Sequence, residues 1–477
     1  MRQINKFIVI VTALLSSVFS TSYQQEKWTL DKCINYALEN NIQIKQQEID
    51  TRTRSASLWQ SKLDLLPSIN ANFNQNYSLG RALDQTTYTF TEDQTIMSNY
   101  FSVNSSVTLF NGLQKINTIK QNKYNLLASL KDLEKFENDI TLNICASYLQ
   151  ILLSIELLDA ANGQLAVTEQ QVERTGKLVK AGSLPQGSLL EIQAQAAAEE
   201  LQVVNAQNQL ELAYLTLIQL LELDTISDFE IDIPEISIIP EDVFNISIQN
   251  IFYTAQSALP QIKSAEYKLR SAEHSLNIAK GYRSPNLSLS GTYSSGYSDS
   301  RQKKTDQETV TIPIGETVSG EVVQSTTQIP VFGTYAFSDQ FRDNASTGIS
   351  LVVSVPILNG WQANNYVSNA KLNILNSKYQ LEYSKNMLFK EIQQAYADAK
   401  ASLKRYKASE KALVAMEESF KYTKQRFEVG LVNIVDYNSA KNQLRNTKSE
   451  LIQSKFDYIF KTKILDFYQG KPLNLGN

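Results

Sequence analysis

The sequence predicts a mainly α-helical chain with a smaller β component, in which long coiled-coil helices and a β-hairpin occur twice in tandem. Three observations support this fold class. Segments recur between the two halves of the 477-residue chain, long stretches without Gly or Pro carry an apolar residue at every seventh position, and two pairs of segments alternate apolar and polar residues. The two hairpins of one protomer are expected to contribute to a transmembrane β-barrel that several copies share.

An internal duplication organises the chain. The segment ALENNIQIKQQE resembles the later segment AQSALPQIKSAE, and Pro67 and Pro285 mark the same offset of about 218 residues. LFNG, ending at Gly112, resembles ILNG, ending at Gly360, at an offset of about 248 residues. Each half is therefore expected to form a helix that stops at a proline, two strands, Asn-Gly, a long helix, a glycine-centred turn and a second long helix.

The first residues have the layout of a secretory signal peptide, which we place at residues 1–22. Arg2 and Lys6 precede an apolar run of about 12 residues that ends in small side chains. The alternative is a membrane anchor, but a spanning helix needs about 20 apolar residues. We expect no later segment to approach a spanning apolar helix, so that any membrane crossing would use β-strands.

The duplication sets the predicted domain boundaries. The first repeat covers residues 23–240, with its barrel hairpin at about 67–111. The second repeat covers residues 241–477, with its hairpin at about 285–359. The stretch 224–242 is extended and contains prolines, so we expect it to join the two repeats.

The longest helices show a coiled-coil pattern. Between Trp361 and Val429 there is neither Gly nor Pro, which allows roughly 100 Å of continuous helix. Apolar or small residues recur there at every seventh position, from Ile392 to Phe427, and again in the first repeat from Ile144 to Val179. The heptads fit paired antiparallel helices, a large helical bundle or a fibrous coiled coil equally well. The strands favour the first of these.

The strand segments have the length and alternation of membrane-spanning β-strands. Ile69, Ala71 and Phe73 alternate with polar residues in the first hairpin, and Ile349 and Leu351 do so in the second. Four strands cannot close a membrane barrel, because the smallest have about eight. Several copies must therefore combine their strands, and the long polar segments 79–99 and 299–344 are expected to be loops outside the barrel.

The composition argues against several other classes of protein. Lys and Arg number 45 against 49 Asp and Glu, so the chain lacks the basic surplus that holds nucleic acid. Cys33, Cys145 and His274 are isolated, so no metal site or other cofactor is expected. No phosphate-binding loop with its lysine, nucleophile elbow or zinc-protease helix occurs, and the chain is not expected to be an enzyme.

The segment QRFEVGLVNIVDYNSAKNQL, from Gln425 to Leu444, resembles the helix-turn-helix signature of the TolC-like outer membrane factors, also called outer membrane efflux proteins. The resemblance covers the whole chain after the predicted signal peptide, and KAGSLPQGSLLEIQAQ is its weaker counterpart in the first repeat. It implies a homotrimer in outer membrane lipid, with a long periplasmic helical portion. It also implies an exit duct that takes cargo passively from a periplasmic adaptor (membrane fusion) protein and an inner-membrane transporter, in tripartite efflux or type I secretion.

The resemblance also implies two groups of functional residues. The glycine turns would contact the adaptor through Ala181, Gly182, Ser183, Val429, Gly430 and Leu431. Glycine at such turns is equally explained by the positive φ that a helix-to-helix turn requires.

The second group would form the constriction at the periplasmic end of the duct. A family carboxylate maps onto Asp436, which in a trimer would form a cation-favouring ring. Asp436 also fits a plain role in the first turn of a helix. The chain departs from the family at the other gate positions: the second carboxylate is Ser439, the arginine is Val432, the tyrosine is Phe427 and the first-repeat aspartate is Ser188.

The main alternative is a non-channel coiled-coil scaffold or adhesin at the cell surface. It explains the heptads, but it does not explain duplicated hairpins at matching places in both halves. The exported cargo, whether drug, metal or protein, is not specified by any motif of this sequence.

Overall fold

The computed structural model describes residues 27–81, 90, 93–224, 229–234, 244, 246–471 and 473. The predicted signal peptide and most of the predicted junction 224–242 lie outside these residues. The chain divides into two compact units. We call them the helical unit, up to Arg54 with Leu126–Lys268 and from Ser377 onward, and the sheet unit, Ser55–Asn125 with Leu269–Asn376.

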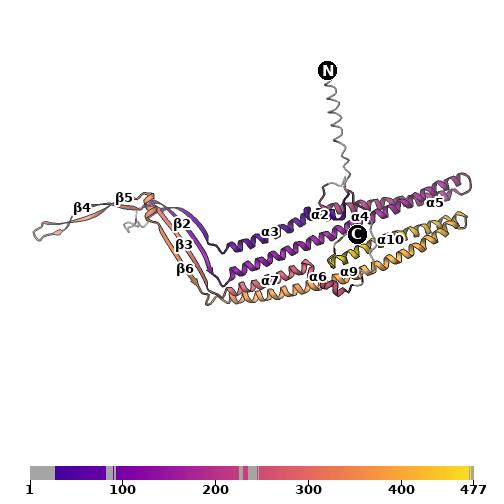
Figure 1. Cartoon of the computed structure of the whole chain (residues 1–477). Coiled ribbons are helices and arrows are strands. Elements are labelled where there is room, and N and C mark those ends of the chain that lie inside the picture. Colours follow the sequence, from indigo (N-terminus) through magenta and orange to yellow (C-terminus); the bar gives the residue numbers. More distant parts are fainter. Residues whose placement is uncertain are drawn as a thin grey trace, which may run out of the picture. The chain divides into compact units, whose positions relative to one another are not determined.

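Each element of the first half has a counterpart in the second half, which also contains β4, β5 and α8 (Figure 1). The first half contains α2 (Leu30–Asn40), α3 (Ile42–Leu63), β1 (Ser68–Gly80), β2 (Gln94–Phe110), α4 (Gln114–Lys180) and α5 (Gln186–Leu221). The second contains α6 (Ile248–Ala258), α7 (Pro260–Gly281), β3 (Asn286–Ser298), β4 (Gln302–Glu316), β5 (Val322–Thr334), α8 (Phe337–Asp343), β6 (Ser346–Ser354), α9 (Gln362–Glu428) and α10 (Ile434–Tyr468). Both α4 and α9 have 67 residues. The predicted mixture of duplicated long helices and β-hairpins is present.

The first helix of each half is interrupted, which the sequence analysis did not predict. In the first half Asn41 has ψ of 126° and ends α2, and its side-chain oxygen accepts hydrogen bonds from the backbone N–H groups of Gln43 (2.9 Å) and Ile44 (3.3 Å) to begin α3. In the second half Pro260 is the first residue of α7 and restricts Leu259 to extended backbone, with ψ of 135°. One break therefore uses a capping side chain and the other a proline.

The heptad positions form the core of the helical unit. Ile144 and Ile151 of α4 are fully buried, as are Ile392 and Ala399 of α9. Figure 1 shows α4 beside α5 and α9 beside α10, as antiparallel hairpins. Burial of these seams is the main stabilising term of such long helices.

One expectation about hydropathy was wrong. Within the described residues, α4 is long and apolar enough to cross a membrane by length and composition alone, and 44% of its most apolar window is buried inside the protein. Tyr148, Leu149 and Leu152 supply part of that buried surface. A buried core helix meets the same test of length and composition as a membrane span.

The strands of the sheet unit form an antiparallel sheet in the order β1-β2-β3-β6, so β1 and β6 are its edges. Directly paired residues share a face. Leu289 pairs with Val107 on one side and Leu351 on the other, and the same face carries further apolar side chains. The opposite face carries hydroxyl and amide side chains, as in the row formed by Asn72, Ser102, Ser294 and Ser346. The sheet thus has one apolar and one polar face.

The two predicted loops are more ordered than expected. Within 79–99, β1 continues to Gly80 and β2 already begins at Gln94. Within 299–344 the chain forms a second antiparallel hairpin, β4–β5, followed by the short helix α8. The second half therefore contains four strands instead of two. The extra residues of this half do lie where the offset between the repeats predicted them.

We expect Asn41→Ala to destabilise the start of α3 by about 1–3 kcal/mol, because it removes a helix cap and leaves a buried carbonyl unpaired. Asn41 is 3% exposed, and its amide donates to the Leu220 carbonyl (3.1 Å) in the last turn of α5. Native-state hydrogen exchange of α3 would measure the loss.

The matched control is Asn40→Ala, which removes only the local hydrogen bond from the Asn40 amide to the Tyr36 carbonyl (3.0 Å). Equal protection of α3 in both variants would contradict the assigned role of Asn41.

Candidate functional site

The two long helical hairpins of the helical unit end in turns of the same geometry. Gly182 and Gly430 have φ of +75° and +76°, a region that costs an L side chain energy. After each glycine, the next residue donates its N–H back into the last helical turn: Ser183 to the Leu178 carbonyl (2.8 Å) and Leu431 to the Arg426 carbonyl. These are Schellman caps. The positive φ predicted for both glycines is therefore present.

The tips expose apolar side chains to solvent. Val429 and Leu431 are 70% and 71% exposed, and Val435 in the first turn of α10 is 63% exposed. On the other hairpin, Leu184 is about one-third exposed. Apolar groups at the very end of a helical hairpin do not stabilise its own core, so they are available to a partner.

The residues predicted from the resemblance to form the constriction make different local contacts. Phe427 of α9 stacks on Tyr437 of α10, with ring centroids 4.6 Å apart. The Tyr437 hydroxyl accepts a hydrogen bond from the Gln171 amide on α4, so the aromatic pair links the two hairpins. Phe420 also packs on Tyr437, at 5.5 Å. Burial raises the pKa of Tyr437, which keeps its hydroxyl protonated.

The other residues that the resemblance suggested for the constriction lie near the starts of α5 and α10. Asp436 is exposed in the first turn of α10, and its N–H donates to the Asn433 side chain (2.8 Å) that caps this helix. The Ser188 N–H donates to the Pro185 carbonyl at the start of α5, and Val432 is half-buried in its turn. These hydrogen bonds are local to each helix start.

Ser439 lies one turn after Asp436 and lines an open groove of about 730 Å³ between α5 and α10. Amide side chains dominate the groove, among them Gln195, Asn438 and Asn442. Gln195 and Asn442 form a hydrogen bond of 3.1 Å across it. The two hairpins are therefore connected here by polar contacts.

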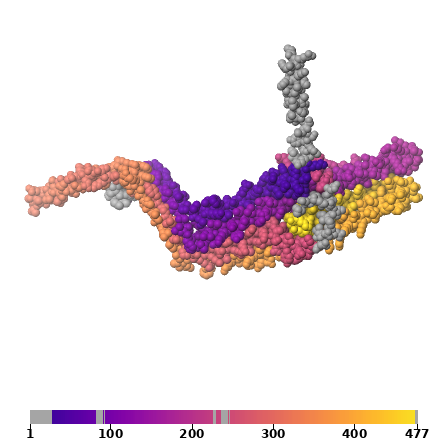
Figure 2. Space-filling view, in the orientation of Figure 1, coloured from indigo at the N-terminus to yellow at the C-terminus, as the bar shows by residue number. Residues whose placement is uncertain are grey.

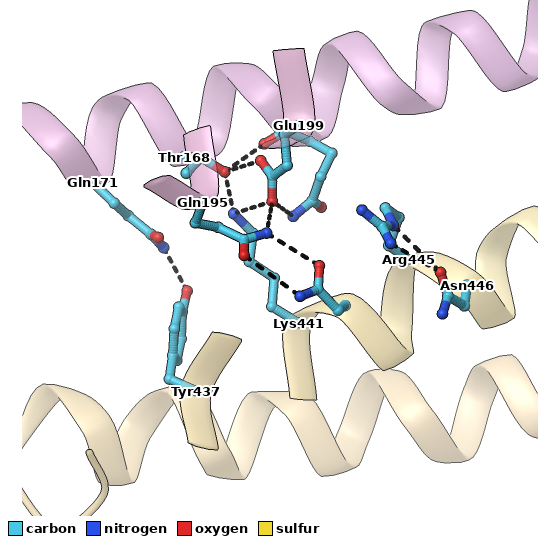
Figure 3. Close-up of polar contacts among 10 residues, drawn as sticks. Thr168, Gln171, Gln195, Glu199, Tyr437, Lys441, Arg445 and Asn446 are labelled. Carbon is cyan, nitrogen blue, oxygen red and sulfur yellow. Dashed lines mark hydrogen bonds and ion pairs between the residues drawn. The ribbon is translucent and has the colours of Figure 1, made fainter. Parts of the chain in front are cut away.

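A group of charged and polar side chains, which shares Gln195 with this groove, surrounds a buried ion pair (Figure 3). We call it the polar layer; it consists of Gln164, Thr168, Gln195, Glu199 and Lys441. Glu199 and Lys441 are each 2% exposed, and the Lys441 ammonium lies 3.4 Å from the Glu199 carboxylate. The carboxylate also accepts from the Gln195 amide (2.7 Å), the Gln164 amide (3.1 Å) and the Thr168 hydroxyl. Every partner of this buried carboxylate is a donor.

The polar layer joins the two halves of the duplication. Lys441 comes from α10, whereas the other members come from α4 and α5. Burial lowers the pKa of the Lys441 ammonium, and the charge of Glu199 opposes that change. A buried ion pair contributes little net stability, but removing one partner leaves an uncompensated buried charge. Loss of either charge is therefore expected to weaken the contact between the hairpins.

The polar layer was not predicted from the sequence, although its charged residues occupy recognisable positions. Glu199 lies seven residues after the buried Ile192, and Lys441 lies four residues after the buried Tyr437. Both are seam positions of a coiled coil, where polar residues are rare and specify register. The sequence alone could not pair them, because they are 242 residues apart and their equivalents in the duplication are Gln193 and Thr447.

We expect Lys441→Met to lower the local stability of α5 and α10 by about 3–5 kcal/mol, because it leaves the buried Glu199 carboxylate without its ion-pair partner. The double variant Glu199→Gln with Lys441→Met should recover most of the loss. Hydrogen exchange of the amides around both residues would measure the opening free energy.

The exposed pair of Glu173 and Lys177 on α4 provides the control, with side chains 70% and 74% exposed. Lys177→Met should leave the exchange rates unchanged. A double variant that is less protected than Lys441→Met would contradict the role of the buried charge.

The chain matches the family model described as "Outer membrane efflux protein" over residues 33–222 and again over 251–459. It is 21% identical over 467 residues to the outer membrane protein TolC of Escherichia coli (strain K12), covering 95% of this chain and 84% of TolC. Among solved structures, CusC superposes with a TM-score of 0.74 at 17% identity, covering 95% of this chain and 96% of CusC. The Campylobacter jejuni CmeC outer membrane channel superposes with a TM-score of 0.71 at 17% identity, covering 92% of this chain and 85% of CmeC.

These comparisons confirm the predicted fold class and the predicted resemblance. The two successive matches of the family model fall one in each half of the duplication. Because they cover most of its length, the chain belongs to the outer membrane efflux protein family and is an outer membrane protein with a long periplasmic helical portion.

Proposed function

We propose that this chain is one protomer of a homotrimeric exit duct, which serves a tripartite efflux or type I secretion system. Cargo would pass from a periplasmic adaptor (membrane fusion) protein and an inner-membrane transporter through the duct to the outside. The duct itself would be passive and would carry out no enzymatic reaction. The energy would come from the transporter.

The observation that carries this proposal is the two-faced sheet with free edges. Leu351 and Val353 on the edge strand β6 are each 61% exposed, and Ile69 on the other edge strand, β1, is 71% exposed. In lipid, the unpaired N–H and C=O groups of β1 and β6 would each cost several kcal/mol, at about the magnitude of a lost hydrogen bond in an apolar medium. Pairing β6 of one protomer with β1 of the next removes both edges, turns the apolar face to lipid and turns the Asn and Ser rows to a water-filled lumen.

The helical tips support contact with an adaptor. The turns Ala181–Ser183 and Val429–Leu431 have matching Schellman geometry, and both expose apolar side chains nearby. A partner with two similar apolar grooves could therefore engage both hairpins of a protomer. We propose these turns as the adaptor contacts.

The constriction is proposed to lie at the starts of α5 and α10. Asp436 and Ser439 are exposed on successive turns of α10, and Ser188 lies in the first turn of α5. Opening would separate the α9–α10 hairpin from the α4–α5 hairpin, which requires breaking both the Gln171–Tyr437 contact and the contacts of the polar layer. Phe427 and Val432 would hold the closed state by apolar packing where the family has charged or hydroxyl groups.

Single-channel recording together with mass in detergent tests the proposed function. We expect a trimer whose openings are small and cation-preferring, because a closed helical entrance restricts flow. A monomer without conductance would contradict the duct and favour a coiled-coil scaffold.

We expect Asp436→Ala to reduce the cation preference of the channel in planar bilayers, because it removes three carboxylates from the constriction of a trimer. The control is Glu173→Gln, which removes an exposed carboxylate that is paired with Lys177 (2.6 Å) on α4. Unchanged selectivity in Asp436→Ala would exclude this residue from the pore.

A further inference from the structure

The β4–β5 hairpin is a long two-stranded ribbon that the family resemblance did not predict. Its strands pair from Gln302 and Thr334 at the base to Glu316 and Val322 near the tip. Nearly all of its residues are exposed, and in the face shown by Figure 2 the other coloured segments lie only at its base. An isolated two-stranded hairpin is at best marginally stable in water. Something in the assembled protein is therefore expected to cover it.

Helix α8 packs against the end of β3 beside the base of the ribbon. Gln340 of α8 is fully buried; its side chain accepts from the Ser298 N–H (3.0 Å) and donates to the Ser298 carbonyl (2.8 Å) at the end of β3. Phe337 packs on Tyr297, with ring centroids 5.2 Å apart. Lys303 in β4 lies 3.8 Å from the Asp343 carboxylate of α8.

The register separates two different faces on the outer part of the ribbon. Val310 pairs with Thr327 and Ile312 pairs with Ser325, so these four side chains share a face. By alternation along β5, Val323 and Ile329 lie on that face too. We call Val310, Ile312, Val323 and Ile329 the distal patch. Ile312 and Val323 are each 39% exposed and Ile329 is 44% exposed.

The opposite face of the same stretch is polar. It carries the pairs Thr311 with Thr326 and Thr309 with Gln328. On the same face as the distal patch, Glu308 is the cross-strand partner of Ile329 and borders the patch toward the base. One face of the ribbon is thus suited to water and the other to burial.

The charges of the ribbon argue against a membrane surface as the cover. From residue 305 to 331 the sequence contains Asp306, Glu308, Glu316 and Glu321 but no Lys, Arg or aromatic residue. Elements that lie on membranes combine Lys and Arg with Trp or Phe, and anionic lipid surfaces repel acidic segments. Lipid is therefore a poor occupant of the distal patch.

We infer that the distal patches of neighbouring protomers pack against one another above the exit of the duct. This inference rests on the proposed function, because a shared barrel places one β4–β5 hairpin per protomer at the same rim. Tethering at one rim gives the hairpins a high effective concentration for each other. The four side chains of the distal patch are uncharged, so packing them together buries no charge. β-Branched residues beside Ser and Thr suit close packing between ribbons.

Cysteine cross-linking tests this contact in the full-length protein purified in detergent. Ile312→Cys places a thiol in the distal patch. Thr311→Cys is the matched control, because it places a thiol at the adjacent position, on the polar face of the ribbon. The native Cys33 and Cys145 are buried, and burial raises the pKa of Cys33 to about 12 and of Cys145 to about 11, so both stay protonated and unreactive.

We expect a mild oxidant to link Ile312→Cys protomers into covalent dimers at least tenfold more than Thr311→Cys protomers. A polymer-bearing maleimide should label Thr311→Cys at least tenfold faster than Ile312→Cys. Equal cross-linking and equal labelling in a sample that is still trimeric would overturn the inference while leaving the proposed duct intact.

Protection of Ile312→Cys in whole cells but not in the purified trimer would also overturn it, because the cover would then be another molecule. A detergent mass without any oligomer would instead remove the proposed function on which the inference rests.

Discussion

The free edges of the four-stranded sheet are the constraint on which the rest of this structure depends. Backbone groups at the edge strands β1 and β6 need partners, and within lipid no water can supply them. The alternation of apolar and polar rows is explained if the sheet closes with further copies into a barrel that has a lipid-facing outer surface and a water-filled lumen. Oligomerisation follows from that requirement.

The duplication repeats the architecture but not the chemistry. The α2–α3 break uses the Asn41 cap, and the equivalent α6–α7 break uses Pro260. At the tips, both turns keep a glycine with positive φ, whereas Glu199 and Lys441 have no charged equivalents in the other half. Equivalent helix breaks can be made by different residues. The contact between the two hairpins of one protomer needs complementary side chains, so its residues differ between the two halves.

Most of the fold could be predicted from local sequence patterns. Heptads, proline positions and two-residue alternation identified the long helices, the strands and the matching order of both halves. The turn glycines at Gly182 and Gly430 were predicted to need positive φ, and they have it. The helix break at Asn41 was missed although Asn is a preferred helix cap: its side-chain oxygen caps α3 locally, and its amide also donates to the carbonyl of Leu220, 179 residues away. The β4–β5 hairpin was missed because Thr- and Gln-rich strands resemble polar loops.

The sequence by itself determined the class of protein, the duplicated architecture and the places where the extra residues of the second half lie. Only the tertiary structure decided which polar residues meet, as in the pairing of Glu199 with Lys441 and the stacking of Phe427 on Tyr437. Periodicity reports which face of an element is buried, because each residue contributes to it independently. Which residues far apart in the chain contact each other depends on how two helices are aligned. That alignment is set only when the hairpins pack together.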